Sequence, residues 1–151
     1  MKILFVCLGN ICRSPVLEAV LRQQARRAGR HDWQVASCGT GGWHAGEGAD
    51  PRSCASAAQR GYTLEAHRAR QLRAADYSDY DWLLAADNDN LAEIRRRRPA
   101  QASACVELAL AFAGLDSPRE VPDPYYGDAA GFDRVIDLAE EFARRVLERD
   151  S

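Results

Sequence analysis

No stretch of this 151-residue sequence is apolar for long enough to cross a membrane, and the chain carries no excess of positive charge. The first apolar run, Lys2 to Val6, is soon followed by Gly9 and Asn10, too early for the core of a signal peptide. The formal net charge of -2 argues against nucleic acid as the main partner, because nucleic-acid-binding domains usually carry a basic excess. We therefore expect a cytoplasmic protein that binds neither nucleic acid nor a membrane.

The sequence also lacks the paired CxxC spacing of a structural zinc site, although it has five cysteines, at positions 7, 12, 38, 54 and 105. Because five is an odd number, they cannot all pair within one chain, and free thiols in a reducing compartment are expected. No internal repeat, low-complexity tract or linker divides the chain. Its length and its 46% hydrophobic content predict a single domain over residues 1–151.

Short apolar runs alternate with helical patterns along the chain. Strands are predicted at Lys2–Val6, Trp33–Ser37, Tyr80–Ala85 and Ala104–Leu108. Helices are predicted after Ser14, after Asp50, from Asn88 to Arg98, and along the apolar stripe from Phe132 to Val146. This alternation predicts an α/β fold whose parallel sheet is covered by helices on both faces. In such folds the ligand binds beyond the carboxyl ends of the strands.

The segment Leu8 to Arg13 lies at that place, between the first predicted strand and the first predicted helix. Backbone N–H groups at a helix N-terminus have no helical partners and can bind one anion. Gly9 is expected to adopt a backbone conformation closed to other residues, and Arg13 can donate two hydrogen bonds to phosphate oxygens. Ser14 is expected to cap the helix, with Pro15 at its first position. The sequence therefore predicts a phosphate-binding loop.

Cys7 ends the predicted strand directly before this loop, where the positive field would stabilise a thiolate. A thiolate that faces a bound phosphate is a nucleophile directed at phosphorus, and a hydrogen bond from Ser14 would improve the sulfur as a leaving group. A C-x5-R pattern also arises by chance, and Cys7 would then be a buried cysteine and Arg13 a surface residue. The strand before the pattern and the Ser-Pro helix start after it favour the catalytic interpretation.

Attack on a phosphoester also needs an acid that protonates the leaving oxygen. Asp123 lies between Pro122 and Pro124, which stiffen the backbone, and it is followed by Tyr125 and Tyr126. Its carboxyl group can reach over the predicted loop, and the tyrosines can form an aromatic wall. A rigid surface turn is the alternative interpretation of this segment on its own.

Together, VCLGNICRSP at residues 6–15 and DPYYG at 123–127 resemble the signature loop and the general-acid loop of the low-molecular-weight protein tyrosine phosphatases. Further segments match the family's order and spacing, at residues 37–40, 43–44, 50–52, 67–72, 87 and 90–91. The resemblance covers essentially the whole chain. It implies a four-stranded parallel sheet flanked by helices on both faces, hydrolysis of phosphotyrosine and aryl phosphates, and no metal or organic cofactor.

The resemblance also implies residue roles. Cys7 would be the nucleophile, Arg13 the phosphate binder, and Asp123 the general acid and then the base. Substrate and phosphate contacts would come from the loop and from aromatic residues: Leu8, Gly9, Asn10, Ile11, Cys12, Ser14, Trp43, Tyr125 and Tyr126. Ser37 and His67 would support the loop together with Asn10, whereas His44 receives no role.

The other cysteines leave questions open. In many family members the cysteine at the position of Cys12 forms a reversible disulfide with the nucleophile and protects it from over-oxidation. A small apolar filler beneath the loop is the alternative. Cys38 stands where alanine is usual in the family, which is expected to be a packing change. The basic run at residues 95–98 is expected to be a solvated helix end.

Two enzymes of the same fold are alternatives, as is a binding module without turnover. An arsenate reductase needs further cysteines on a nearby segment, and there is none between Cys54 and Cys105. A protein-arginine phosphatase usually carries threonine at the position of Ile11. Binding of phosphotyrosine alone would not require both Cys7 and Asp123. We expect a mainly monomeric enzyme whose partner is a phosphotyrosine-containing protein. By analogy with bacterial relatives in the family, tyrosine kinases are one class of such partners.

Overall fold

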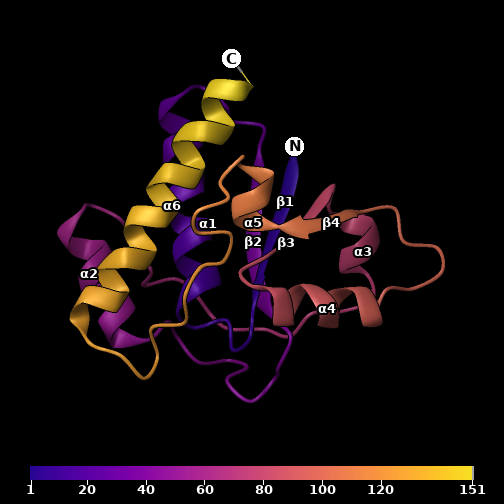
Figure 1. The fold of residues 1–151 in the computed structure, drawn as a ribbon, viewed down its shortest axis with the longest axis horizontal. Helices are drawn as coiled ribbons and strands as arrows, with labels where there is room; N and C mark the ends of the chain where they lie inside the picture. Colours follow the sequence, from indigo (N-terminus) through magenta and orange to yellow (C-terminus); the bar gives the residue numbers. More distant parts are fainter. Residues whose placement is uncertain (151) are drawn as a thin grey trace.

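The computed structural model describes residues 1–150, and a four-stranded sheet forms its centre (Figure 1). The strands are β1 (Lys2–Cys7), β2 (Gln34–Gly39), β3 (Trp82–Ala85) and β4 (Cys105–Leu108). They lie in the order β2-β1-β3-β4, and every neighbouring pair is parallel. The predicted α/β class and parallel sheet are confirmed, and no strand end differs from the predicted one by more than two residues.

Helices cover both faces of this sheet, as predicted (Figure 1). They are α1 (Arg13–Arg27), α2 (Pro51–Gln59), α3 (Asp76–Asp79), α4 (Asn88–Arg96), α5 (Ala109–Phe112) and α6 (Ala129–Arg149). The core on one face is formed with α1, α2, α5 and α6, and the core on the other face with α3 and α4. The short helix α5 was not among the predicted elements, because four residues are too few to show a helical period.

Strand β1 is buried on both faces. Its side chains alternate between the two cores: Ile3, Phe5 and Cys7 pack on the α1 side, and Leu4 and Val6 pack on the α4 side. A strand in the middle of a parallel sheet has no polar face, which explains its unbroken apolar run.

The N-terminus of α1 differs from the prediction. Cys12 is the N-cap residue, and no side chain caps the helix. Ser14 lies inside the first turn, where its hydroxyl is 3.0 Å from Cys7 Sγ and accepts a hydrogen bond from Asn10 Nδ2 at 2.8 Å. The predicted cap is therefore wrong, because tertiary contacts engage the hydroxyl. The same prediction is confirmed for α2, where the Asp50 carboxylate accepts from the Arg52 N–H.

The basic run at residues 95–98 lies at the end of α4. Arg96 and Arg97 form ion pairs with Glu93 one turn earlier in the same helix. Hydrogen bonds from these arginines hold the pKa of Glu93 at about 2. The run is thus a solvated, internally paired helix end, as predicted.

The topology places the loop after β1 at a special position. The chain leaves β1 through α1 to reach β2 on one side, and later enters β3 on the other side of β1. A loop at such a reversal of strand order borders a crevice in which ligands commonly bind. The strands run away from the N-terminus marked in Figure 1, so this loop lies at the end of the sheet far from it.

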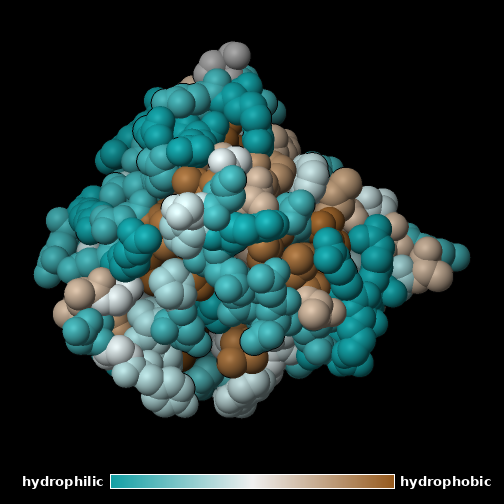
Figure 2. All heavy atoms as spheres, viewed as in Figure 1, coloured by the Kyte–Doolittle hydropathy of each residue, from teal (hydrophilic) through white to brown (hydrophobic). Residues whose placement is uncertain are grey.

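The face of the molecule in Figure 2 gives few other hints of a binding site. The face seen in Figure 2 is mostly hydrophilic, and its hydrophobic residues show only in small, separate groups. Among residues 1–150, no helix combines the length and the apolar character that crossing a membrane requires.

Candidate active site

The loop between β1 and α1 turns at Asn10, whose φ of 58° lies in the left-handed region. The sequence predicts this conformation for Gly9, and that prediction is wrong. Glycine at position 9 serves close approach instead, because a Cβ there would lie 2.9 Å from Cδ2 of His44. Asparagine tolerates the left-handed region better than most residues other than glycine, so the turn is compatible with the sequence.

Contacts from four sides hold Asn10, which is fully buried. Its Nδ2 donates to Oγ of Ser14 at 2.8 Å and to Oγ of Ser37 at 3.0 Å. Its Oδ1 accepts from the backbone N–H of Arg70 at 3.0 Å, and its carbonyl oxygen lies 2.7 Å from Nε2 of His67. The structure thus brings both predicted loop-supporting residues, Ser37 and His67, into contact with Asn10.

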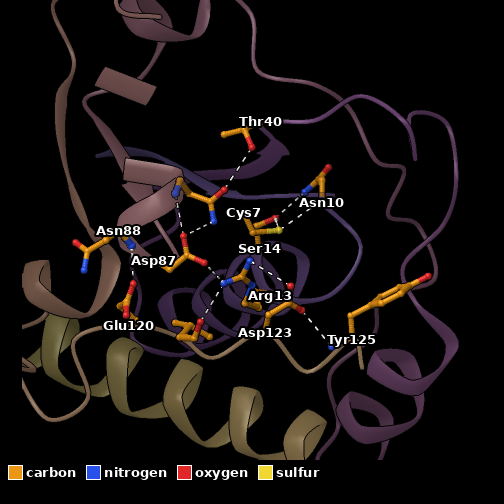
Figure 3. A network of polar contacts seen from close by, with 12 residues as sticks. Cys7, Asn10, Arg13, Ser14, Thr40, Asp87, Asn88, Glu120, Asp123 and Tyr125 are labelled. Carbon is orange, nitrogen blue, oxygen red and sulfur yellow. Dashed lines mark hydrogen bonds and ion pairs between the residues drawn. The ribbon is translucent and has the colours of Figure 1, made fainter. Parts of the chain in front are cut away.

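The sulfur of Cys7 lies inside this loop (Figure 3). It accepts a hydrogen bond from the backbone N–H of Asn10 at 3.3 Å and lies 3.0 Å from Oγ of Ser14. Hydrogen bonds donated to sulfur favour its charged form. The Cys7 sulfur is therefore in contact with two polar groups of its own loop and helix start.

The neighbouring thiols have different surroundings. Burial, with the Asp50 carboxylate as a second cause, raises the pKa of Cys12 to about 12, so Cys12 is a neutral thiol near pH 7. Burial also raises the pKa of Cys38. Cys38 packs on the α4 side of the sheet and Cys7 on the α1 side, so the sheet separates these two side chains.

Arg13 is buried beside the loop, with 3% of its surface exposed. Its Nη1 donates to Asp87 Oδ2 at 2.6 Å and to the carbonyl oxygen of Val121 at 3.1 Å (Figure 3). Burial alone would lower the pKa of Arg13, but the nearby Cys7 and Asp87 outweigh burial and raise it. The guanidinium is thus a fixed cation next to the Cys7 sulfur.

Asp123 reaches the same place from the segment between α5 and α6. Its Oδ2 lies 3.7 Å from Nη2 of Arg13, and its Oδ1 accepts from the backbone N–H of Tyr125 at 3.1 Å. Its side chain is 44% exposed. The carboxylate therefore faces both the buried cation and open solvent.

These groups enclose a cavity of about 270 Å³. It is lined by Cys7, Leu8, Gly9, Ile11, Cys12, Arg13, Trp43, His44, Asp123, Tyr125 and Tyr126. Among the predicted contact residues, Asn10 and Ser14 do not line it, because both lie fully buried behind the loop. The lining combines the buried Cys7 thiol and Arg13 cation with the partly exposed Asp123 carboxyl group and with aromatic rings at the mouth, where Trp43 and Tyr126 are exposed.

Comparison with known proteins identifies the family. Residues 2–149 match the family of low molecular weight phosphotyrosine protein phosphatases. The chain belongs to this family. It is thus a protein-tyrosine phosphatase, a phosphoric monoester hydrolase, and the resemblance predicted from the sequence is confirmed.

Individual relatives of this phosphatase span nearly its whole length. A low molecular weight protein-tyrosine-phosphatase from Streptomyces coelicolor is 44% identical over 152 residues, which cover 97% of this chain and 91% of the relative. A protein tyrosine phosphatase from Entamoeba histolytica has a similar crystal structure, with a TM-score of 0.92 and 37% identity, covering 99% and 96% of the two chains. A drosophila arginine phosphatase also has this fold, with a TM-score of 0.93, 30% identity and coverage of 100% and 98%.

Asp87 is a residue of the phosphatase site for which the sequence pattern predicts no role. It binds Arg13, and its Oδ1 accepts from the backbone N–H and from Nδ2 of Asn90, both at 2.8 Å. Asn90 in turn accepts from Thr40 Oγ1 at 3.3 Å. The position of Asp87 just after β3, at the carboxyl edge of the sheet, was the signal that could have indicated this role.

The aromatic mouth of the phosphatase site contains two further residues without a predicted role. The ring of His44 lies between those of Trp43 and Tyr125, with centroid distances of 6.5 Å to each. The Arg52 guanidinium lies 5.3 Å from the Tyr125 ring centroid and forms an ion pair with Asp50 at 2.8 Å. Arg52 therefore supports Tyr125 from outside the cavity.

Replacing Asn10 tests whether its contacts shape the loop of the phosphatase. Asn10→Gly keeps the left-handed backbone but loses three side-chain hydrogen bonds, each of which stabilises by about 1 kcal/mol. We therefore expect urea unfolding to show a loss of about 2 to 3 kcal/mol and inorganic phosphate to inhibit more weakly. Asn10→Ala should lose about 1 kcal/mol more, because alanine is strained at this φ. Wild-type phosphate inhibition in Asn10→Gly would show that the contacts do not shape the loop.

Proposed function

We propose that this phosphatase hydrolyses phosphotyrosine in proteins through a cysteinyl-phosphate intermediate on Cys7. The observation that carries the proposal is one cavity in which the Cys7 thiol, the Arg13 cation and the Asp123 carboxyl group meet beneath aromatic side chains. A nucleophile, a phosphate-binding cation and a proton donor are the groups that attack on a phosphoester requires.

In the first step the phosphate enters the loop as a dianion, and Arg13 and the loop N–H groups bind its oxygens. The Cys7 thiolate attacks phosphorus opposite the phenolic oxygen, so that an S–P bond forms while the P–O bond to the ring breaks. Asp123 gives its proton to the departing phenolic oxygen. Charge on the equatorial oxygens is stabilised throughout by the cation and the backbone dipoles.

In the second step the Asp123 carboxylate takes a proton from water while the water oxygen attacks phosphorus. The S–P bond breaks, inorganic phosphate leaves, and the sulfur returns to the thiolate. The Asn10 N–H and the Ser14 hydroxyl, both within hydrogen-bond distance of the sulfur, support it as a leaving group. Protons and electrons balance over the two steps, and no step requires a metal or an organic cofactor.

The aromatic rings at the mouth support a preference for aryl phosphates. A phosphotyrosine ring spans the distance between the loop and the protein backbone of the substrate, where Trp43 and Tyr125 can contact it. Phosphoserine has no ring that these aromatic side chains could contact. The substrate class is therefore a phosphotyrosine-containing protein, with bacterial tyrosine kinases as one candidate group.

The alternatives within the fold have weaker support. Arsenate reduction needs a disulfide relay through further cysteines on a nearby segment, and the sequence has none between Cys54 and Cys105. Cys38 packs on the face of the sheet opposite Cys7. An arginine phosphatase shares this fold, but Ile11 stands here at the position where such enzymes usually carry threonine. Phosphotyrosine is therefore the favoured substrate.

Phosphate release from matched phosphotyrosyl, phosphoseryl and phosphoarginyl peptides tests the substrate class. Reductant and a metal chelator are present in every assay. We expect fast release from the phosphotyrosyl peptide and release at least about 100-fold slower from the other two, since the loss of positioning alone is of that order. Faster release from the phosphoarginyl peptide, or no turnover of any peptide, would contradict the proposal.

Oxidation tests the second cysteine of the loop. Peroxide oxidises the Cys7 thiolate to a sulfenic acid, and the Cys12 thiol can then attack that sulfur, releasing water and forming a disulfide. After mild peroxide, thiol reductant should restore most of the wild-type activity but little of the activity of Cys12→Ser. Cys38→Ala should recover like the wild type, because its side chain lies across the sheet. Equal recovery of Cys12→Ser and the wild type would show that no protective disulfide forms.

A further inference from the structure

Glu120 joins the segment that carries Asp123 to the start of α4. Its Oε2 accepts a hydrogen bond from the backbone N–H of Asn88, the first residue of the helix, at 2.7 Å (Figure 3). That N–H has no partner within the helix, and a carboxylate at a helix N-terminus is also favoured by the helix dipole. The contact links two parts of the chain that are 32 residues apart.

The next residue, Val121, is tied to the same place. Its backbone N–H donates to the carbonyl oxygen of Ala86 at 2.8 Å, and its own carbonyl oxygen accepts from Arg13 at 3.1 Å. Asp87, between Ala86 and Asn88, accepts a hydrogen bond from the same guanidinium nitrogen, Nη1 of Arg13, at 2.6 Å. Residues 86–88, at the entry to α4, therefore contact both the phosphate-binding arginine and the base of the segment that carries the acid.

Asp123 itself has few contacts that fix its position. Its carboxylate accepts one hydrogen bond, from Tyr125 two residues later, and lies 3.7 Å from Arg13, with 44% of the side chain exposed. The proline on each side restricts the local backbone, so the direction of the carboxyl group follows from where residues 120–122 are anchored. Val121 is anchored by its fully buried side chain and its two backbone hydrogen bonds, and Glu120 adds a side-chain hydrogen bond one residue earlier, at the start of this stretch.

We propose that Glu120 is a positioning residue for the general acid: its contact with Asn88 holds the segment so that the Asp123 carboxyl group meets the leaving oxygen. The inference rests on the proposed role of Asp123. If Glu120 positions Asp123, replacing Glu120 should slow hydrolysis most for the substrates whose leaving oxygen most needs a proton. A purely structural role in α4 predicts equal loss for all substrates.

Two aryl phosphates separate these roles. Phenyl phosphate has a basic leaving group that needs the acid, whereas 2,4-dinitrophenyl phosphate has a leaving group that departs without it. The value of kcat/KM reports the first phosphoryl transfer for both. Glu120→Ala should lower kcat/KM about 5- to 10-fold for phenyl phosphate, the size of losing one typical hydrogen bond, and less than about twofold for the dinitrophenyl ester. Glu120→Gln, whose amide oxygen can still accept from Asn88, should recover part of the loss.

A control in the same helix turn removes charge without touching the segment of Asp123. Asp89 is exposed in the first turn of α4, and Asp89→Ala should change both substrates by less than about twofold. Adding Glu120→Ala to Asp123→Asn should cause little further loss for phenyl phosphate, because the two residues act through one proton transfer.

The outcomes distinguish the inference from the proposed function. Suppose that Asp123→Asn lowers kcat/KM selectively for phenyl phosphate. An equal fall in kcat/KM for both esters in Glu120→Ala, or an unchanged value for phenyl phosphate, would then overturn the positioning role. A full additional loss in the double variant would overturn it as well. If Asp123→Asn shows no selective loss, the proposed function of Asp123 fails first, and the inference fails with it.

Discussion

Cys7→Ser is expected to abolish phosphate release while the protein still folds and binds phosphate. A hydroxyl at this position stays protonated under conditions in which the thiol ionises, so the nucleophile is lost. Removing the nucleophile of an enzyme that forms a covalent intermediate lowers kcat by about 10⁴-fold or more. Serine has nearly the volume of cysteine, so the free energy of unfolding should change by less than about 1.5 kcal/mol.

Steady-state kinetics with a phosphotyrosyl peptide measure the loss of kcat. Urea unfolding measures the change in stability, and calorimetric titration measures phosphate binding. Cys12→Ser is the matched control, because it makes the same substitution in the same loop at a thiol that is neutral near pH 7. Its kcat should stay within about tenfold of the wild type. Substantial turnover by Cys7→Ser, or an equal loss in both variants, would contradict Cys7 as the nucleophile.

Asp123→Asn is expected to show the second-largest effect. An amide cannot donate the proton that the phenolic oxygen needs, and general-acid catalysis typically contributes about 10²- to 10⁴-fold. We therefore expect kcat/KM for phenyl phosphate to fall by about 10²-fold or more, and for 2,4-dinitrophenyl phosphate by less than about tenfold. Phosphate should still bind, because Arg13 and the loop are unchanged.

The control for this variant lies a few residues further along the chain. Asp128 caps α6 by accepting from the Gly131 N–H at 3.3 Å and does not line the cavity. Asparagine caps helices about as well as aspartate, so Asp128→Asn should leave both rates and stability near the wild type. An Asp123→Asn variant that loses the same factor for both esters would indicate a misplaced loop rather than a lost acid.

The fold and the centre of the site could be predicted from the sequence for one physical reason. Parallel strands end at one edge of the sheet, so a loop that follows β1 and a segment that follows β4 and α5 meet there. Cys7 and Arg13 flank the loop after β1, and Asp123 lies between two prolines in the segment after α5. Local pattern and topology together were therefore sufficient to bring these three residues to one place.

Residues whose role depends on contacts between distant segments could not be predicted in this way. Asp87 binds Arg13 across 74 positions, and Glu120 binds Asn88 across 32. Local rules also failed where tertiary contacts override them. Ser14 does not cap α1, since Cys7 and Asn10 engage its hydroxyl.

The most direct test of the central claim is to locate the phosphoryl group in the covalent intermediate. The wild-type enzyme is mixed with an excess of phosphotyrosyl peptide, stopped with denaturant within the first turnover, digested with trypsin and examined by fragmentation mass spectrometry. Cleavage after Lys2 and Arg13 yields one peptide that holds both Cys7 and Cys12, so fragmentation between them assigns the site. We predict one phosphoryl group on Cys7 and none on Cys12. A phosphoryl group on any other residue, or product formed without a phosphorylated enzyme, would contradict the mechanism.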